Sequence, residues 1–110
     1  MTEKIKTIED MMTTSDMIEC AYAELSKLDT ELEAVRDKYV NKYVRTYDHV
    51  YALGREDHSW GVWLEHHIAL YRQTHEGTIA NVGALELKIE LIKGRIAMMK
   101  GWIKDVQHSL

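Results

Sequence analysis

The sequence predicts an all-α fold, an elongated antiparallel bundle of three helices with coiled-coil-like packing. Three observations lead to this class. The 110-residue chain contains no proline, and proline in a helix interior costs about 3 kcal/mol. Apolar residues recur three and four positions apart, which is the spacing of one helix face. No segment shows the strict alternation of a half-buried strand. The length corresponds to a single domain, residues 1–110.

The first helix is expected over about residues 16–53. Polar residues that can cap a helix N-terminus stand at Thr14–Asp16. Gly54 is expected to end the helix, because glycine readily adopts the left-handed conformation of the C′ position. A short leading turn over Ile8–Met12 is compatible with Thr7 as its cap. The apolar face of the first helix consists of Met17, Ala21, Leu25, Leu28, Leu32, Val35 and Tyr39.

The second helix is expected over about residues 58–76. Asp57 or Ser59 can supply its N-cap oxygen, and the helix should end near Gly77. Its apolar stripe consists of Trp60, Trp63, Leu64, His67, Ile68 and Tyr71.

The third helix is expected over about residues 79–108, with Thr78 as its cap. A single bent rod spanning the second and third helices is the alternative, since Gly77 and Gly83 would each cost only about 1 kcal/mol inside a helix. A heptad seam runs along the third helix for more than three heptads, which is typical of coiled-coil packing. The seam consists of Leu85, Ile89, Ile92, Ile96, Met99, Ile103, Val106 and Leu110.

A second apolar stripe follows another face of the third helix, and two of its members, Gly94 and Gly101, are one heptad apart. Glycine is costly in a helix, so close approach by another helix would explain both. A helix that is apolar on two faces is normally buried between two partners. One face is expected to pack inside the subunit and the other against a second copy. The alternative is a simple bundle with this helix at its centre. The stripe consists of Ala84, Leu87, Leu91, Gly94, Met98, Gly101 and Trp102.

Charge is distributed unevenly along a chain whose formal net charge is −4. Residues 1–35 hold 3 basic and 9 acidic side chains, a net charge of −6. Residues 82–110 hold 5 basic and 3 acidic side chains, a net charge of +2. The two segments are therefore expected to attract one another, either as an antiparallel helix pair or across a dimer.

The composition limits the classes of function. A single cysteine, Cys20, cannot form an internal disulfide and favours a reducing, cytoplasmic location. No apolar run approaches the roughly 20 residues that span a bilayer, and no secretory signal is visible. A membrane is therefore not an expected partner.

Neither catalysis nor metal binding is indicated by a motif, so we expect no cofactor, no metal site and no catalytic residue. No two histidines are three or four residues apart, the spacing at which side chains on one helix share an ion. Acidic neighbours of Cys20 discourage a reactive thiolate. The histidines are His49, His58, His66, His67, His75 and His108.

Four tyrosines recur at every fourth residue in the second half of the first predicted helix. On one helix they would step around the axis by about 40° each, so that they form an aromatic stripe beside a basic flank. The stripe consists of Tyr39, Tyr43, Tyr47 and Tyr51, and the flank of Lys38, Lys42, Arg45 and His49.

Three interpretations of the aromatic stripe are open. The tyrosines can pack in the core or in a subunit interface with their hydroxyls at the rim. They can bind a partner protein, because Tyr and Arg are favoured at binding hot spots. Rings beside cations also suit the bases and phosphates of a nucleotide or nucleic acid.

The function that these observations favour is a small, non-catalytic helical module for protein–protein interaction, acting as an adaptor, assembly factor or inhibitor. Its expected partners are another copy of itself and a protein partner. The alternative is nucleotide or nucleic-acid binding through the basic flank, Lys38, Lys42, Arg45 and His49. The candidate interaction residues are Tyr39, Tyr43, Tyr47, Tyr51, Leu87, Leu91, Gly94, Met98 and Trp102.

Overall fold

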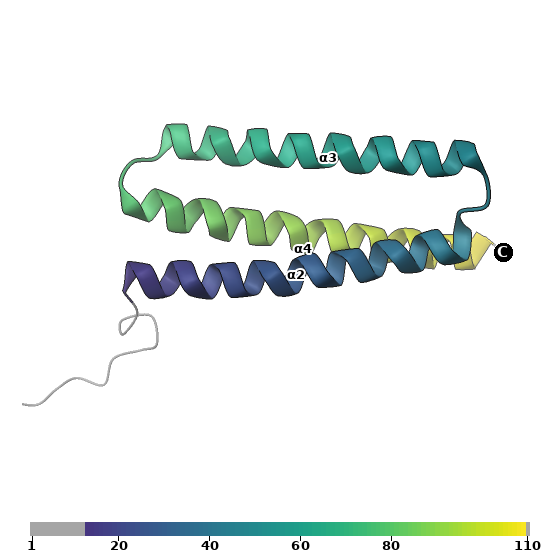
Figure 1. Ribbon diagram of the computed structural model, residues 1–110, viewed down its shortest axis with the longest axis horizontal. Helices are drawn as coiled ribbons and strands as arrows, with labels where there is room; N and C mark the ends of the chain where they lie inside the picture. Colours follow the sequence, from purple (N-terminus) through teal and green to yellow (C-terminus); the bar gives the residue numbers. More distant parts are fainter. Residues whose placement is uncertain (1–12, 110) are drawn as a thin grey trace, which may run out of the picture.

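The described part of the chain, residues 13–109 of a computed structural model, is built from three helices (Figure 1). They are α2 (Thr14–Tyr43), α3 (Tyr47–Thr74) and α4 (Thr78–Ser109). No strand occurs among these residues, so the predicted all-α, three-helix class is confirmed. The turn predicted over Ile8–Met12 lies outside the described residues.

The predicted end of the first helix is wrong. Instead of running to residue 53, α2 ends at Tyr43, and α3 begins only four residues later. Thr46 is the N-cap of α3, and its side chain accepts a hydrogen bond from the His49 backbone N–H at 3.1 Å. This cap satisfies one of the orphan N–H groups of a new helix, so the chain can turn here without a glycine.

The residues that were predicted to separate the first two helices lie inside α3 instead. Gly54 does not end a helix, and neither Asp57 nor Ser59 caps one. Gly54 is exposed and no atom would contact a Cβ added to it. Its presence in a helix interior therefore costs only the usual amount for glycine, about 1 kcal/mol.

The turn between α3 and α4 lies where the sequence predicts it. Gly77 adopts a φ of 80°, a left-handed conformation that residues with a Cβ rarely take. The two helices are separate, so the alternative of one bent rod is wrong. The observed α4, Thr78–Ser109, agrees with the predicted 79–108 to within one residue at each end, although Thr78 is its first residue rather than its cap.

The core follows the heptad seam of α4. Five members of the seam are buried and Ile89 is half-buried. They pack against the apolar face of α2 and, less extensively, against α3. Burying a side chain of this size contributes about 1.5–3 kcal/mol, so this seam is a main source of stability. The buried seam residues are Leu85, Ile92, Ile96, Met99 and Ile103, and their partners on α2 are Ala21, Leu25, Leu28 and Val35.

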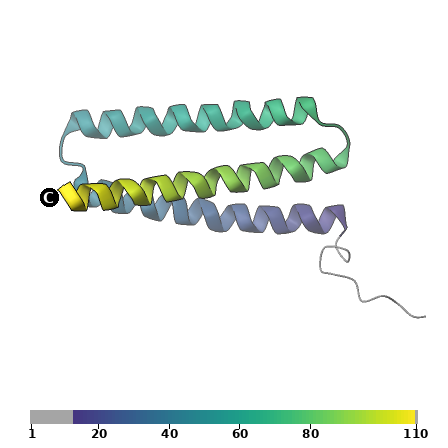
Figure 2. The ribbon, with the colours of Figure 1, turned by 180° about the vertical axis from the view of Figure 1, so that it is seen from behind.

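The helices run up, down and up, so α3 is antiparallel to both neighbours while α2 and α4 run side by side in the same direction (Figures 1 and 2). The expected attraction between the acidic and basic segments includes an ion pair between described residues, Lys100 Nζ to Glu31 Oε1 at 3.1 Å. The two helices that carry these segments, α2 and α4, were expected to be antiparallel. This expectation is wrong, because α3 returns the chain to the end at which α2 begins. The resulting molecule is elongated, 68 × 31 × 18 Å.

Candidate interaction surface

The four tyrosines of the predicted aromatic stripe do not share one helix. Tyr39 and Tyr43 lie on α2 and are half-buried, whereas Tyr47 and Tyr51 lie on α3. Tyr47 is 93% exposed and Tyr51 is 69% exposed. The break between α2 and α3 therefore divides the stripe into a covered pair and an exposed pair, and the prediction of a single aromatic face is wrong.

Tyr39 joins all three helices near the end at which α2 meets α3. Its hydroxyl forms a hydrogen bond with Nε2 of His49 on α3 at 3.0 Å. Its ring centroid lies 6.0 Å from that of Trp102 on α4 and 5.8 Å from that of Tyr43. Tilted and edge-on ring pairs at such distances stabilise beyond their burial alone. Tyr39 therefore has a structural role, and its hydroxyl is the hydrogen-bond partner of the His49 side chain.

The predicted basic flank is also divided. The Arg45 guanidinium donates hydrogen bonds to the backbone carbonyls of Asn41, Lys42 and Val44, at 2.7–3.1 Å. The carbonyls of Asn41 and Lys42 belong to the last turn of α2, where they lack helical partners, and Val44 is the C-cap residue of this helix. Arg45 thus caps α2, whereas Lys38 and the Lys42 side chain remain exposed. The flank is thus distributed over α2, the turn and α3, and two of its members, Arg45 and His49, already have hydrogen-bond partners.

The second stripe of α4 is covered unevenly. Ala84 is fully buried, and Leu87, Leu91 and Trp102 are half-buried. Met98 is 43% exposed. Within the described part of the chain, no atom of another element would contact a Cβ added at Gly94 or Gly101. The close helix that these glycines suggested is therefore neither α2 nor α3.

Apolar side chains on α3 add to the exposed apolar surface. Trp63 is 46% exposed and stacks on His67, with ring centroids 4.9 Å apart. Leu70, two turns further along, is 57% exposed. An apolar side chain that is exposed singly needs no explanation, whereas several together indicate a contact surface.

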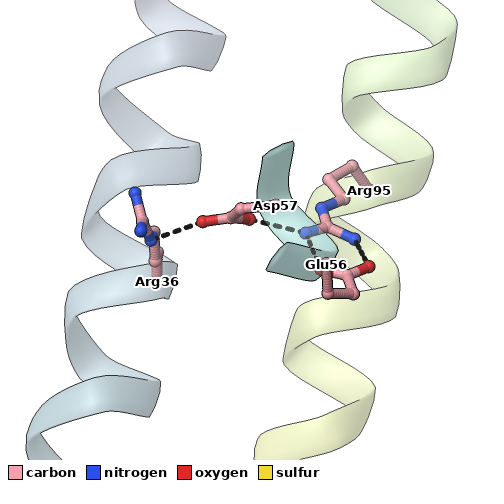
Figure 3. Close-up of polar contacts among 4 residues, drawn as sticks. All are labelled: Arg36, Glu56, Asp57 and Arg95. Atoms are coloured by element: carbon pink, nitrogen blue, oxygen red, sulfur yellow. Dashed lines mark hydrogen bonds and ion pairs between the residues drawn. The ribbon is translucent and has the colours of Figure 1, made fainter. Parts of the chain in front are cut away.

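An ionic cluster around a buried arginine, which the sequence analysis did not foresee, joins α4 to the middle of α3 (Figure 3). The Arg95 side chain on α4 is only 1% exposed, and its guanidinium forms a bidentate pair with Glu56. It also donates to Asp57 Oδ1 at 2.6 Å, while Asp57 Oδ2 lies 2.6 Å from Arg36 Nε on α2. The four side chains therefore connect all three helices.

Two indole rings complete the surroundings of the Arg95 guanidinium. Its carbon lies 5.1 Å from the centroid of Trp60 and 5.3 Å from that of Trp102, which is within the range of cation–π attraction. The hydrogen bonding that the Arg95 guanidinium donates to the Glu56 carboxylate is the main cause that raises the pKa of Arg95, and burial acts in the opposite direction. Arg95 therefore stays charged in the folded protein.

A signal for this cluster was present in the sequence. Arg95 interrupts the second stripe of α4 at helical spacing, since it follows Leu91 by four residues and precedes Trp102 by seven. A charge at such a position requires a partner. The adjacent acids Glu56 and Asp57 were the candidates, but only the packed helices show that they reach it.

Within residues 13–109, no three His, Cys, Asp or Glu side chains whose positions are described are placed to share a metal ion. None of the described helices is long and apolar enough to span a bilayer.

Comparison of the chain with protein-family models, with curated proteins and with solved structures gave no significant match. Its function must therefore be inferred from its own geometry.

Proposed function

We propose that this protein is a non-catalytic helical interaction module that pairs through the outer stripe of α4, the name used here for Leu87, Leu91, Gly94, Met98 and Gly101. A helix from a second copy of the chain packs on this stripe. The resulting assembly binds a protein partner and acts as an adaptor, assembly factor or inhibitor. The proposal includes a cytoplasmic location, since a lone thiol such as Cys20 suits a reducing compartment.

One observation carries the proposal, namely the open space above Gly94 and Gly101 next to exposed Met98. Two helical glycines cost about 2 kcal/mol relative to alanine, and among the described residues no close contact at either glycine compensates for this cost. A helix laid on the outer stripe could approach the α4 backbone closely and would cover Met98. A stable interface buries about 1,200–2,000 Å² in total, so the exposed apolar residues of α3, Trp63 and Leu70, would be needed as well.

The mass of the protein in solution tests self-association. Light scattering after size exclusion should give a mass of at least twice the 12.8 kDa of one chain, and Met98→Glu should reduce it to that of one chain. Val50→Glu is the matched control, because Val50 is an exposed apolar residue on α3 outside this surface. A wild-type mass of one chain up to about 100 µM, where micromolar association is nearly complete, would overturn the pairing.

Capture of a protein partner tests the second part of the proposal. Wild type and Met98→Glu would be used side by side to recover proteins from a lysate of the source cells, with identification by mass spectrometry. The expected result is a partner recovered by wild type and lost with the variant. Recovery of no partner, together with measurable turnover of a small substrate, would contradict a non-catalytic module.

Nucleotide or nucleic-acid binding receives less support from the geometry, because Arg45 is occupied and the tyrosines are divided. Fluorescence anisotropy with DNA, RNA and cyclic dinucleotides at low salt should therefore stay flat. Salt-sensitive binding, which phosphate contacts produce, would favour that alternative if it were lost in Lys38→Gln/Lys42→Gln.

A further inference from the structure

The open face of α4 carries a row of residues spaced alternately four and three apart, the spacing of a face that can pack against another helix. The row has an acid at its N-terminal end, a base at its C-terminal end and three small residues between them. All of its members are exposed except Gly101, which is half-buried. The row, named here the Glu90–Lys104 row, consists of Glu90, Gly94, Ala97, Gly101 and Lys104.

The order of residues in the Glu90–Lys104 row is self-complementary. Ala97 stands seven residues after Glu90 and seven residues before Lys104. If the row is turned end for end about Ala97, Glu90 meets Lys104, and Gly94 comes within one residue of Gly101. Two antiparallel copies of α4 would therefore join opposite charges at both ends of the contact, and the two-fold symmetry of such a pair makes these contacts identical.

The charged ends of the row are accessible to a second copy. The Glu90 side chain is 72% exposed, and its ion pair with Lys93 is long, 3.6 Å from Oε1 to Nζ. Lys104 is exposed and forms no ion pair with any acid whose side chain is described. The neighbouring Lys100 is already compensated by Glu31 of its own chain. Lys104 is therefore the base that can pair with Glu90 of a second copy.

The small residues of the row would let two helix backbones come close. Among the described residues, no atom of another element would contact a Cβ added at Gly94 or Gly101, and Ala97 between them is exposed. Helix axes in contact lie 8–10 Å apart, depending on the side chains at the contact. Glycine and alanine on both helices favour the short end of this range.

Met98 lies beside the row and would be covered by the same pairing. It is 43% exposed and follows Ala97 directly, so a two-fold axis near Ala97 brings Met98 of one copy next to Met98 of the other. Lys104 projects about 120° away from Met98 around the helix axis. The methionine contact and the ion pairs therefore form on different sides of the row.

The charges of the row disfavour a parallel pairing. Parallel helices in register would place each residue of the row beside its own counterpart, Glu90 beside Glu90 and Lys104 beside Lys104. Like charges that are brought together across an interface oppose association. The charge order of the row therefore selects the antiparallel orientation.

We propose that the helix packed on the outer stripe of α4 is α4 of a second copy, antiparallel to the first, with the two-fold axis near Ala97. Glu90 of each copy pairs with Lys104 of the other, and the two Met98 side chains are in contact. This inference rests on the proposed self-association and adds the facing helix, its orientation and its register. An interface formed by the same surface of both copies closes on itself, so the assembly is a dimer and not a filament.

Cross-linking between introduced cysteines tests the orientation. Glu90→Cys and Lys104→Cys would each be made in a Cys20→Ser background and treated with a short bismaleimide, separately and after equilibration as a mixture. The mixture should give a covalent dimer that contains one chain of each variant. Either variant alone should not, since two copies of residue 90 would lie about 21 Å apart along the helix axes. Val50→Cys in the same background, an exposed position on α3, gives the level of random cross-linking.

A cysteine on the proposed axis tests which helix faces α4. Ala97→Cys in the same Cys20→Ser background should cross-link with itself, because residue 97 of one copy lies next to residue 97 of the other. Mass spectrometry of the digested product identifies the linked residues.

Charge reversal is a second, independent measurement. Glu90→Lys and Lys104→Glu should each raise the Kd of the dimer roughly ten-fold, which corresponds to the loss of two exposed ion pairs. Glu90→Lys/Lys104→Glu should restore the wild-type Kd. Glu33→Lys is the matched control for net charge, because Glu33 is an exposed acid on α2, and it should leave the Kd unchanged. Sedimentation equilibrium measures each Kd, and far-UV circular dichroism confirms that each variant is as helical as wild type.

Three results would overturn the inference. They are self-cross-linking of Glu90→Cys without a mixed product, an absence of cross-linking in both Ala97→Cys and the mixture, and a charge-reversed double variant that dimerises no better than the single variants. Each of them can occur while the wild-type protein has the mass of two chains, and the proposed self-association would then still hold. A wild-type mass of one chain would overturn both proposals.

Discussion

Among single residues, Arg95 has the most constrained surroundings. Its guanidinium is buried between two tryptophans and bonded to two acids. The acids are more accessible, since the side chain of Glu56 is 42% exposed and that of Asp57 is 22% exposed. A carboxylate that loses Arg95 can therefore turn to water, whereas a guanidinium that loses both acids stays charged and buried. Removing the two acids should therefore destabilise the fold more than removing the arginine.

The first prediction concerns this asymmetry. Glu56→Gln/Asp57→Asn should lower the free energy of unfolding by about 3 kcal/mol, because it leaves a buried charge without its partners. Arg95→Met, of similar volume, should cost less. Urea denaturation measures both. Glu90→Gln is the control, since its pair with Lys93 at 3.6 Å is exposed and such pairs contribute about 0–1 kcal/mol. An Arg95→Met variant that is the less stable of the two would contradict this account.

The second prediction concerns the pH dependence of Arg95. Because its pKa is raised in the folded state, the stability from this shift is complete below the unfolded-state pKa and is lost only as the pH rises through the folded-state pKa. From about pH 6 to about pH 9, far below the ordinary arginine value, the difference in unfolding free energy between wild type and Arg95→Met should be constant. A steady decline of that difference over this range would show that another group is titrating.

The third prediction compares two glycines. Gly83→Ala should destabilise the fold by about 1–3 kcal/mol, because the Tyr71 hydroxyl lies against Gly83, the new methyl group displaces it and overpacking carries such costs. Gly54→Ala should stabilise it by up to about 1 kcal/mol, because its surroundings are open. Thermal melts followed by circular dichroism compare the two. If both substitutions stabilised the protein equally, Tyr71 would not lie on Gly83.

At the scale of the helices, the position of the first break depends on local capping. The apolar periodicity of α2 ends near Tyr39, so no core contact requires the same helix to continue. Thr46 offers an N-cap and Arg45 covers the preceding carbonyls. The sequence pointed to Gly54 as the end of the first helix. The break instead occurs at Thr46, whose side chain accepts a hydrogen bond from a backbone N–H of the next helix.

The fourth prediction tests this cap. Thr46→Ala should lower the free energy of unfolding by about 1 kcal/mol, the usual cost of losing an N-cap oxygen. Ser59→Ala is the control, because Ser59 is exposed inside α3, where alanine is the better helix former. Chemical denaturation distinguishes the outcomes, and a larger loss for Ser59→Ala than for Thr46→Ala would place the cap where the sequence alone had suggested it.

At the scale of the whole molecule, α4 contacts both other helices, while no other described residue lies over Gly94 and Gly101 of its outer stripe. Heptad spacing correctly predicted the seam that α2 covers. The second stripe was expected to be covered as well, and the chain covers only part of it, from Ala84 to the half-buried Leu91. The proposed pairing would cover the open part around Met98 and complete the burial of Leu87 and Leu91.

The fifth prediction distinguishes the isolated chain from the assembly. Gly94→Ala should raise the melting temperature at low protein concentration, because alanine favours the helix and meets no neighbour. At high concentration the gain should shrink or reverse, since the added methyl group hinders a second helix. Melts over a hundred-fold range of concentration measure this crossing. A gain that stays constant would mean that nothing approaches Gly94.

Spacing and composition were sufficient for the helical class, the number of helices, the buried seam of α4 and the turn at Gly77. These features depend on propensity and periodicity, which act over a few neighbouring residues. The division of the tyrosines, the burial of Arg95 and the exposure of Met98 required the packed structure. Arg95 meets Glu56 across 39 positions of sequence, and Lys100 meets Glu31 across 69. Contacts at such separations depend on how the helices are placed beside one another, because no local pattern records which faces will meet.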